Sequence, residues 1–240
     1  MRLDAGELVD FYESAVGHAA RRLISHRIKE IWPHLKGLRV LGYGFAPPYL
    51  ESYLAEAERV VALMPARTGV VAWPGGRQLA VLGEEDALPF AEAMFDRILV
   101  VHGLEGADAA RPLLRALWRV LAPEGRILLV APNRASLWAQ MEVSPFACGR
   151  PFHRSELTAL LGDTLFEPLQ WERALYLPPF SGRRLSRLGD GLEKLGRRLL
   201  PGIAGVHLVE ASKSLYGTTI KSLRAKEVAL RPAHTLQGRY

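Results

Sequence analysis

Apolar residues recur along this chain in two patterns. Over residues 7–32 they stand three or four positions apart, from Leu8 through Ile31, and this spacing predicts a leading helix or helix pair that ends at Pro33. Further along, short, mostly apolar runs predict strands that are buried on both faces of a sheet. Such runs lie at 38–41, 59–65, 78–82, 98–101 and 126–130.

Helical stretches alternate with these runs. One begins at Tyr49 with the sequence YLESYLAEAE, and another covers residues 112–121 and ends before Pro123. Strands that alternate with helices are typical of α/β proteins with mostly parallel sheets. We therefore expect an α/β fold. A further short helix is expected over Ser155–Leu161, with Ser155 as its N-cap.

A leucine stripe follows in the C-terminal part. Its spacing of 3-4-3-4 and the arginine and lysine residues around it predict a basic amphipathic helix. The leucines are Leu185, Leu188, Leu192, Leu195 and Leu199. Such a helix packs on its own domain, holds a protein partner or lies on a membrane surface. The lack of aromatic residues in it argues against the membrane.

Composition sets the class of protein. The 240 residues are 49% hydrophobic, which is enough for a substantial core in one domain with a C-terminal extension. The single cysteine, Cys148, excludes an internal disulfide framework and is compatible with a reducing cytosol. The acidic start does not resemble a signal peptide, and no apolar run is long enough for a membrane span. We expect a cytoplasmic protein.

The net charge of +6 is unevenly distributed. Residues 1–140 hold 16 Lys and Arg against 16 Asp and Glu, whereas residues 141–240 hold 15 against 9. The basic part is a solvated face or meets an anionic partner. Nucleic acid is one such partner, but no aromatic side chains alternate with the basic ones before Tyr240, so base stacking is not indicated. No metal-ligand motif occurs.

A glycine-rich turn follows the first predicted strand. It reads Gly42-Tyr43-Gly44-Phe45-Ala46, and glycines at such a point let the backbone approach a ligand closely. A nicotinamide dinucleotide fingerprint needs a third glycine where Pro47 stands, so that site is not favoured. The spacing resembles the first motif of class I S-adenosylmethionine-dependent methyltransferases, with Ala46 in place of the third glycine.

Three further segments resemble the same family. The acidic run that begins at Glu84 precedes Leu88-Pro89-Phe90, as in the family segment whose acid faces the adenine amino group. Phe95-Asp96 and Leu104-Glu105 match the family pattern for the next strand and for the residues that follow it. The most specific match is the run Arg119–Val130, RVLAPEGRILLV, which is similar to methyltransferases of the "type 11" kind. The resemblance covers residues 38–133.

The resemblance implies a Rossmann-like, mostly parallel seven-stranded sheet flanked by helices, completed by an antiparallel pair at Leu169–Leu175 and Val206–Val209. It also implies that S-adenosylmethionine is the cofactor. The expected cofactor-binding residues are Gly42, Tyr43, Gly44, Ala46, Met64, Glu84, Glu85 and His102. Met64 stands where the family has a ribose-binding carboxylate, which weakens the expected site, because Met accepts hydrogen bonds poorly.

The chemistry expected after the fourth strand centres on His102. It leaves the strand at the edge where open α/β sheets bind ligands, so we expect it to act as a base or orienting group, with Glu105 second. Asn133 and Arg150 are expected to contact the substrate, an unidentified methyl acceptor. An ordered packing role is the alternative for the loop around Arg150.

The expected organisation is an N-terminal helical lid (1–33), a methyltransferase domain (34–212) and a basic tail (213–240). Methyl transfer is the leading function. The alternative is a non-catalytic binding module, in which Met64 and Pro47-Pro48 have compromised the pocket and the Leu185–Leu199 helix holds a partner.

Overall fold

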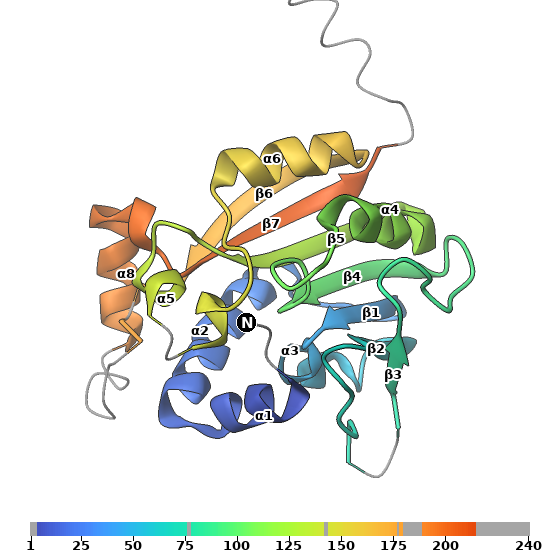
Figure 1. Cartoon of the computed structure of the whole chain (residues 1–240), viewed down its shortest axis with the longest axis horizontal. Helices are drawn as coiled ribbons and strands as arrows, with labels where there is room; N and C mark the ends of the chain where they lie inside the picture. Colours follow the sequence, from blue (N-terminus) through green and yellow to red (C-terminus); the bar gives the residue numbers. More distant parts are fainter. Residues whose placement is uncertain (1–3, 76–77, 142–143, 177, 180–188, 215–240) are drawn as a thin grey trace, which may run out of the picture.

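A seven-stranded sheet forms the centre of the computed structural model, which describes residues 4–75, 78–141, 144–176, 178–179 and 189–214 (Figure 1). The strands are β1 (Arg39–Gly44), β2 (Arg59–Pro65), β3 (Ala80–Gly83), β4 (Phe95–Val101), β5 (Leu121–Pro132), β6 (Phe166–Ala174) and β7 (Val206–Lys213). They lie in the order β3-β2-β1-β4-β5-β7-β6.

The sheet combines a parallel and an antiparallel part. Strand β1 pairs in parallel with β2 and β4, and β4 pairs in parallel with β5. The last strand, β7, lies antiparallel between β5 and β6. This topology confirms the expected seven-stranded Rossmann-like methyltransferase fold, including its antiparallel C-terminal pair. The carboxyl ends of the parallel strands therefore meet at one edge.

Helices cover both faces of the sheet (Figure 1). The helices are α1 (Ala5–Glu13), α2 (Ala15–Ile31), α3 (Pro47–Leu50), α4 (Ala110–Val120), α5 (Leu137–Gln140), α6 (Arg154–Asp163) and α8 (Gly189–Leu199), with 3-10 turns η1 (Glu51–Tyr53), η2 (Pro145–Ala147) and η3 (Pro201–Ile203). The first three pack on one face, and α4 and α6 pack on the other.

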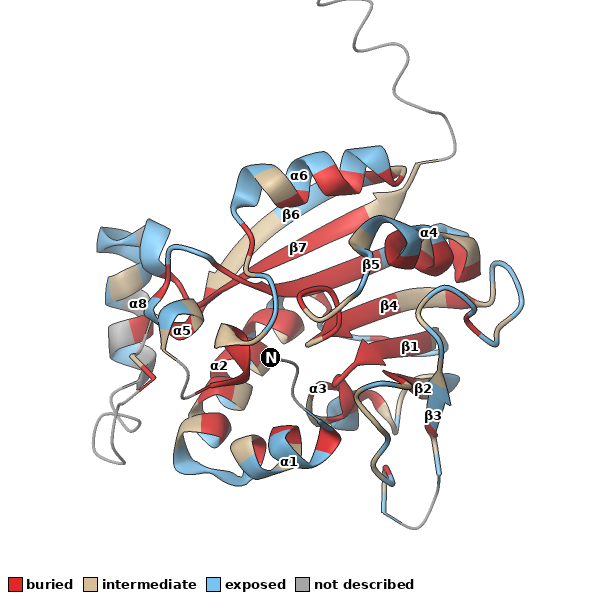
Figure 2. Ribbon diagram, in the orientation of Figure 1, coloured by how far each residue is buried: buried red, intermediate tan, exposed pale blue. Residues whose placement is uncertain are grey.

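Side chains of the central strands alternate between two apolar clusters. In β1, Val40 joins the cluster under α1 and α2, whereas Leu41 joins the cluster under α4 and α6. Both are fully buried, and Figure 2 shows the central strands buried along most of their length. This accounts for the mostly apolar runs in the sequence, because a strand covered on both faces has no polar side.

One helix prediction was confirmed and two needed correction. The leading stretch is a helix pair that breaks at Ser14, whose hydroxyl accepts the Gly17 N–H at the start of α2. The helix after the glycine turn begins at Pro47 and is far shorter than expected, because the chain must return to β2. Helix α6 begins at Arg154 with His153, not Ser155, as N-cap, and the His153 N–H binds the Glu156 carboxylate.

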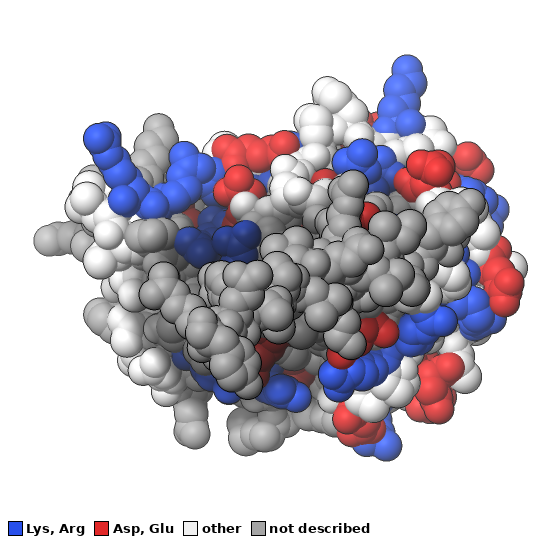
Figure 3. Space-filling view, turned by 90° about the horizontal axis from the view of Figure 1, so that it is seen from above, with Lys and Arg blue, Asp and Glu red and all other residues white. Residues whose placement is uncertain are grey.

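Helix α8 is the described part of the predicted leucine stripe. Leu199 is 63% exposed, and Leu195 is also exposed, while basic side chains gather at the end of the molecule where this helix lies (Figure 3). The stripe residues before 189 and the tail after 214 lie outside the described residues. Docking of a protein partner here stays a prediction. None of the described helices has the length and apolar character that crossing a membrane would require.

Candidate functional site

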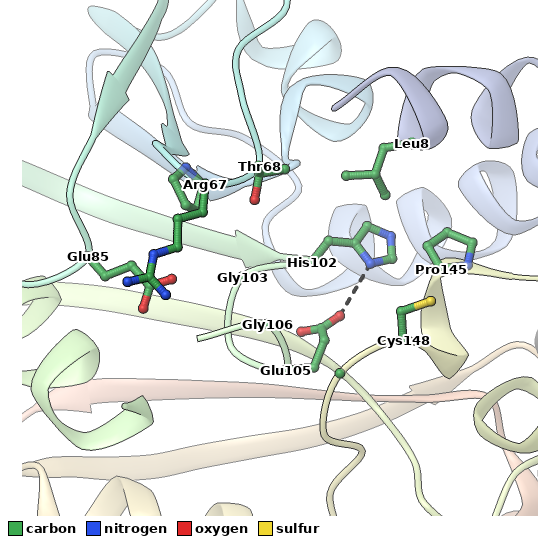
Figure 4. Close-up of a pocket in the computed structure, with 12 residues that line it drawn as sticks. Leu8, Arg67, Thr68, Glu85, His102, Gly103, Glu105, Gly106, Pro145 and Cys148 are labelled. Atoms are coloured by element: carbon green, nitrogen blue, oxygen red, sulfur yellow. Dashed lines mark hydrogen bonds and ion pairs between the residues drawn. The ribbon is translucent and has the colours of Figure 1, made fainter. Parts of the chain in front are cut away.

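A pocket opens at the carboxyl ends of the parallel strands. We call it the His102 pocket (Figure 4). Its lining comes from α1, from the segments that follow β2, β3 and β4, and from the loop around η2. The lining residues are Leu8, Pro65, Arg67, Thr68, Glu85, His102, Gly103, Glu105, Gly106, Pro145, Cys148 and Gly149.

His102 is held rigidly at the end of β4. Its backbone adopts φ +50°, an uncommon conformation for a residue with a side chain, which turns the chain away from the sheet. The ring contacts Phe146 at a centroid distance of 4.7 Å. Its Nδ1 lies 3.2 Å from the Glu105 Oε1, and its Nε2 lies 2.8 Å from the Tyr12 hydroxyl. Both ring nitrogens therefore already have protein partners.

Two tyrosines that sequence analysis did not single out extend this hydrogen-bonded chain. The Tyr12 hydroxyl lies 2.8 Å from that of Tyr49. Burial, the neighbouring Tyr49 and the Glu105 charge raise the pKa of Tyr12, and burial raises the pKa of Tyr49, so both stay protonated. One assignment satisfies every contact: Tyr49 donates to Tyr12, Tyr12 donates to His102 Nε2, and His102 Nδ1–H donates to Glu105.

The glycines of the turn serve the packing of the chain itself. Gly44 has φ +80°, and a Cβ there would lie 2.3 Å from the Val101 carbonyl oxygen. A Cβ on Gly42 would lie 2.5 Å from a Leu50 methyl group. Tyr43 points into the cluster on the opposite face of the sheet, and Ala46 is fully buried. Among the described residues, these four are not part of the pocket lining.

Met64 is not part of that lining either. Its side chain is 0% exposed and packs in the cluster under α1 and α2, so a carboxylate at this position would be buried among apolar groups. The next residues, Pro65, Arg67 and Thr68, are the ones that reach the pocket. Arg67 forms an ion pair with Asp108, which is not part of the pocket lining.

The acidic run after β3 divides between two hollows. Glu85 lines the His102 pocket and accepts the Asp108 N–H at 3.0 Å. Glu84 and Asp86 line only the neighbouring hollow, which Glu85 also borders. Glu85 therefore borders the His102 pocket and Glu84 does not, and the role of either carboxylate toward adenine stays a prediction.

The two predicted substrate residues lie away from the His102 pocket. Asn133 is 3% exposed, and its side-chain N–H groups donate to the carbonyls of Gly202 and Ala204 at 2.8 Å each. It therefore has no amide donor left for a substrate. The Arg150 side chain is 67% exposed and lies by Glu156, while its backbone N–H donates to the Glu105 carbonyl at 2.8 Å.

A family model described as a methyltransferase domain matches residues 41–129. This span runs from the glycine turn through β4, His102 and Glu105 into β5. These residues form a class I methyltransferase domain. S-adenosylmethionine is the cofactor of this family. No curated protein sequence matches the chain.

Several solved structures share the fold of this domain. One is a Thermotoga maritima S-adenosylmethionine-dependent methyltransferase, described as a possible histamine N-methyltransferase (TM-score 0.59, 17% identity, 87% of this chain and 95% of that chain). Another is the Burkholderia thailandensis 1,6-didemethyltoxoflavin-N1-methyltransferase with bound 1,6-didemethyltoxoflavin and S-adenosylhomocysteine (TM-score 0.52, 19% identity, 87% of this chain and 82% of that chain). A third is the [4+2]-cyclase SpnF (TM-score 0.58, 18% identity, 85% of this chain and 84% of that chain).

The pocket wall of this methyltransferase domain suits a ligand with N–H donors. Glu105 Oε2 is buried and has no hydrogen-bond partner among the described residues, and Glu85 offers a second carboxylate at the rim. S-adenosylmethionine carries N–H donors on its adenine and on its methionine half. The residues present therefore fit the cofactor, with Glu85 and Glu105 as the acceptor groups. The described residues contain no group of His, Cys, Asp or Glu that could hold a metal ion.

Proposed function

We propose that this methyltransferase transfers a methyl group from S-adenosylmethionine to an acceptor that enters the His102 pocket. The observation that carries the proposal is the position of this pocket at the carboxyl ends of β2, β3 and β4, around residues of the matched methyltransferase span. Ligands of open α/β sheets bind at this edge. The cofactor supplies the reactive methyl group when bound, and the protein contributes mainly alignment.

The N-terminal helices serve as a lid in this proposal. Helix α1 places Leu8 in the pocket wall and Tyr12 against His102. The loop around η2 closes the pocket from the other side with Pro145 and Cys148. A reaction site enclosed in this way excludes water from the reacting groups.

An amine is the first acceptor class to test. The pocket contains two carboxylates, Glu85 and Glu105, while its one lining cation, Arg67, is paired with Asp108. An acidic wall favours a basic ligand. The name of the Thermotoga maritima neighbour, which includes histamine N-methylation, agrees with this class. We expect the reaction to take place in the cytoplasm.

A non-catalytic binding module is the second candidate. The observation that favours it is the packing over the glycine turn, where the Tyr12 ring stacks on Phe45 at a centroid distance of 5.8 Å and Met64 replaces the family carboxylate. In this candidate the fold is kept, and the exposed leucines of α8 bind a protein partner.

Calorimetric titration of the full chain with S-adenosylmethionine, and separately with S-adenosylhomocysteine, tests the proposal. Micromolar binding is expected. Glu85→Gln should weaken it several-fold because Glu85 lines the pocket, and Glu84→Gln is the matched control because Glu84 lines only the neighbouring hollow. Absence of binding into the millimolar range would contradict the proposal and favour the binding module.

A further inference from the structure

Only one oxygen of the Glu105 carboxylate has a hydrogen-bond partner among the described residues. Its side chain is 4% exposed, and its Oε1 accepts the only hydrogen bond that the described residues give to this carboxylate, from His102. Oε2 is buried without a donor. A buried carboxylate oxygen costs free energy unless a hydrogen bond or a cation satisfies it. The structure therefore leaves one strong acceptor open in the pocket wall.

His102 offers no open hydrogen-bonding atom of this kind. Its Nδ1 faces Glu105 and its Nε2 faces Tyr12, so both ring nitrogens are occupied in the assignment given above. Its side chain is 5% exposed. His102 therefore fixes the rotamer of Glu105 and does not itself present a free atom to a ligand.

The loop that follows the pocket fixes the backbone of the same residue. The Arg150 N–H donates to the Glu105 carbonyl, and Gly149, with φ +82°, brings its Cα so close that a Cβ would lie 2.3 Å from that carbonyl oxygen. Glu105 is thus held at its backbone by one segment and at its side chain by another. This degree of positioning is typical of a preorganised binding group.

We propose that Glu105 is the ligand-binding carboxylate of this pocket and takes an amine through Oε2, with His102 and Tyr12 as positioning residues. The amine has two sources: the amino group on the methionine half of the cofactor, or an amine on the acceptor. The cofactor source rests on the proposed function. Charge-assisted hydrogen bonds of this kind are about twice as strong as neutral ones.

The test is calorimetric titration of the full chain and its Glu105→Gln variant with three probes. The probes are S-adenosylhomocysteine, its deamino analogue 5′-[(3-carboxypropyl)thio]adenosine, and histamine. The two nucleosides differ only at the amino group. We expect the wild type to bind S-adenosylhomocysteine at least tenfold more tightly than the analogue, and Glu105→Gln to abolish this difference while binding of the analogue is unchanged.

The other outcomes separate the two sources and the two proposals. If Glu105→Gln weakens only histamine at least tenfold, the amine belongs to the acceptor. If all three probes bind the variant and the wild type equally, the role of Glu105 is overturned. If the wild type binds neither nucleoside, the proposed function fails, and the histamine titration decides the role of Glu105. Binding of histamine to the wild type but not to Glu105→Gln would support that role. Absence of histamine binding to the wild type would overturn it.

Two controls keep the result specific to the pocket. Glu193→Gln removes the charge of another buried carboxylate, which accepts the backbone N–H groups of Leu175 and Tyr176 outside the pocket, and it should leave all probes unchanged. Tyr12→Phe tests positioning in a chain that keeps Glu105. It should reduce the discrimination between the two nucleosides without weakening the deamino analogue, whereas a purely structural role would weaken both equally.

Discussion

Gly44 turns the end of β1 where no larger residue fits. Its φ of +80° strains any residue with a Cβ, and that Cβ would lie 2.3 Å from the Val101 carbonyl oxygen. We expect Gly44→Ala to lower the free energy of unfolding by roughly 2–4 kcal/mol, measured by urea denaturation. Gly162→Ala is the control, because a Cβ there meets nothing within 4 Å. Equal stability of the two variants would refute this account of the turn.

The hydroxyls of Tyr12 and Tyr49 should be energetically coupled. Tyr12→Phe leaves the His102 Nε2 and the Tyr49 hydroxyl without their shared partner, so we expect a loss of about 1–3 kcal/mol. In a double-mutant cycle with Tyr49→Phe, the two losses should not add. Thr164→Val, which removes a buried hydroxyl bound to the Leu160 carbonyl, should add to Tyr49→Phe. Additivity of the two tyrosine variants would show that their contact carries no energy.

Helix α1 depends on its first turn. The Asp4 carboxylate accepts the Glu7 N–H, and the Glu7 carboxylate accepts the Asp4 N–H. We expect Asp4→Ala to cost about 1 kcal/mol and to speed hydrogen exchange in α1 more than elsewhere, because α1 contacts the sheet through few residues. Asp10→Ala, an exposed site on the same helix, is the control and should stay within about 0.5 kcal/mol of wild type. Uniform exchange in both variants would contradict the prediction.

Sequence patterns identified the strands well but did not single out the two tyrosines whose hydroxyls form the hydrogen-bonded chain with His102. A strand buried on both faces is visible as a local apolar run, so β2 was predicted at its observed bounds, whereas β1 ends three residues later and β4 begins three residues earlier than predicted. Tyr12 and Tyr49 were visible only as helical positions, since the partners of their hydroxyls lie 37 and 90 residues away along the chain. No local pattern records such contacts.

The predicted substrate role of Arg150 stays a prediction, and the contacts of this residue show a related limit of sequence patterns. Its side chain, which sequence analysis weighed, points to Glu156, whereas its backbone N–H binds Glu105. Backbone groups are present in every residue, so a sequence cannot mark which of them will be used. The glycine turn is a second example. Its composition was recognised in the sequence, but the atom that lies close to Gly44 is the Val101 carbonyl oxygen of the chain itself and not a ligand atom.

His207 makes the stability of the molecule depend on pH. Burial, with the nearby charges of Arg173, Arg154 and His153, lowers the pKa of His207 to about 4. The unfolded chain, with a His pKa near 6.5, therefore binds more protons than the folded one between about pH 4 and 6.5, and stability falls as the pH falls through this window. Above about pH 6.5 this residue has no effect on the slope.

His207→Leu should remove that contribution. We expect the variant to lose less stability than the wild type between pH 6.5 and 4, with a slope smaller by up to about 1.4 kcal/mol per pH unit, measured by urea denaturation across the range. His26→Gln, at an exposed histidine, should follow the wild-type slope. Parallel curves for His207→Leu and wild type would mean that His207 is protonated equally in both states.

The order of the strands has a consequence for the growing chain. Strand β6 is synthesised before β7, yet β7 lies between it and the rest of the sheet. During translation β6 therefore has no hydrogen-bonded partner strand until Val206–Lys213 leaves the ribosome. The same strand brings Glu210, which binds Trp32, Arg126 and Gln170, so the last strand to be made connects the first helices to the sheet. Completion of the domain is thus a late event in its synthesis, and an interrupted chain would expose β5 and β6 as open edges for misassembly.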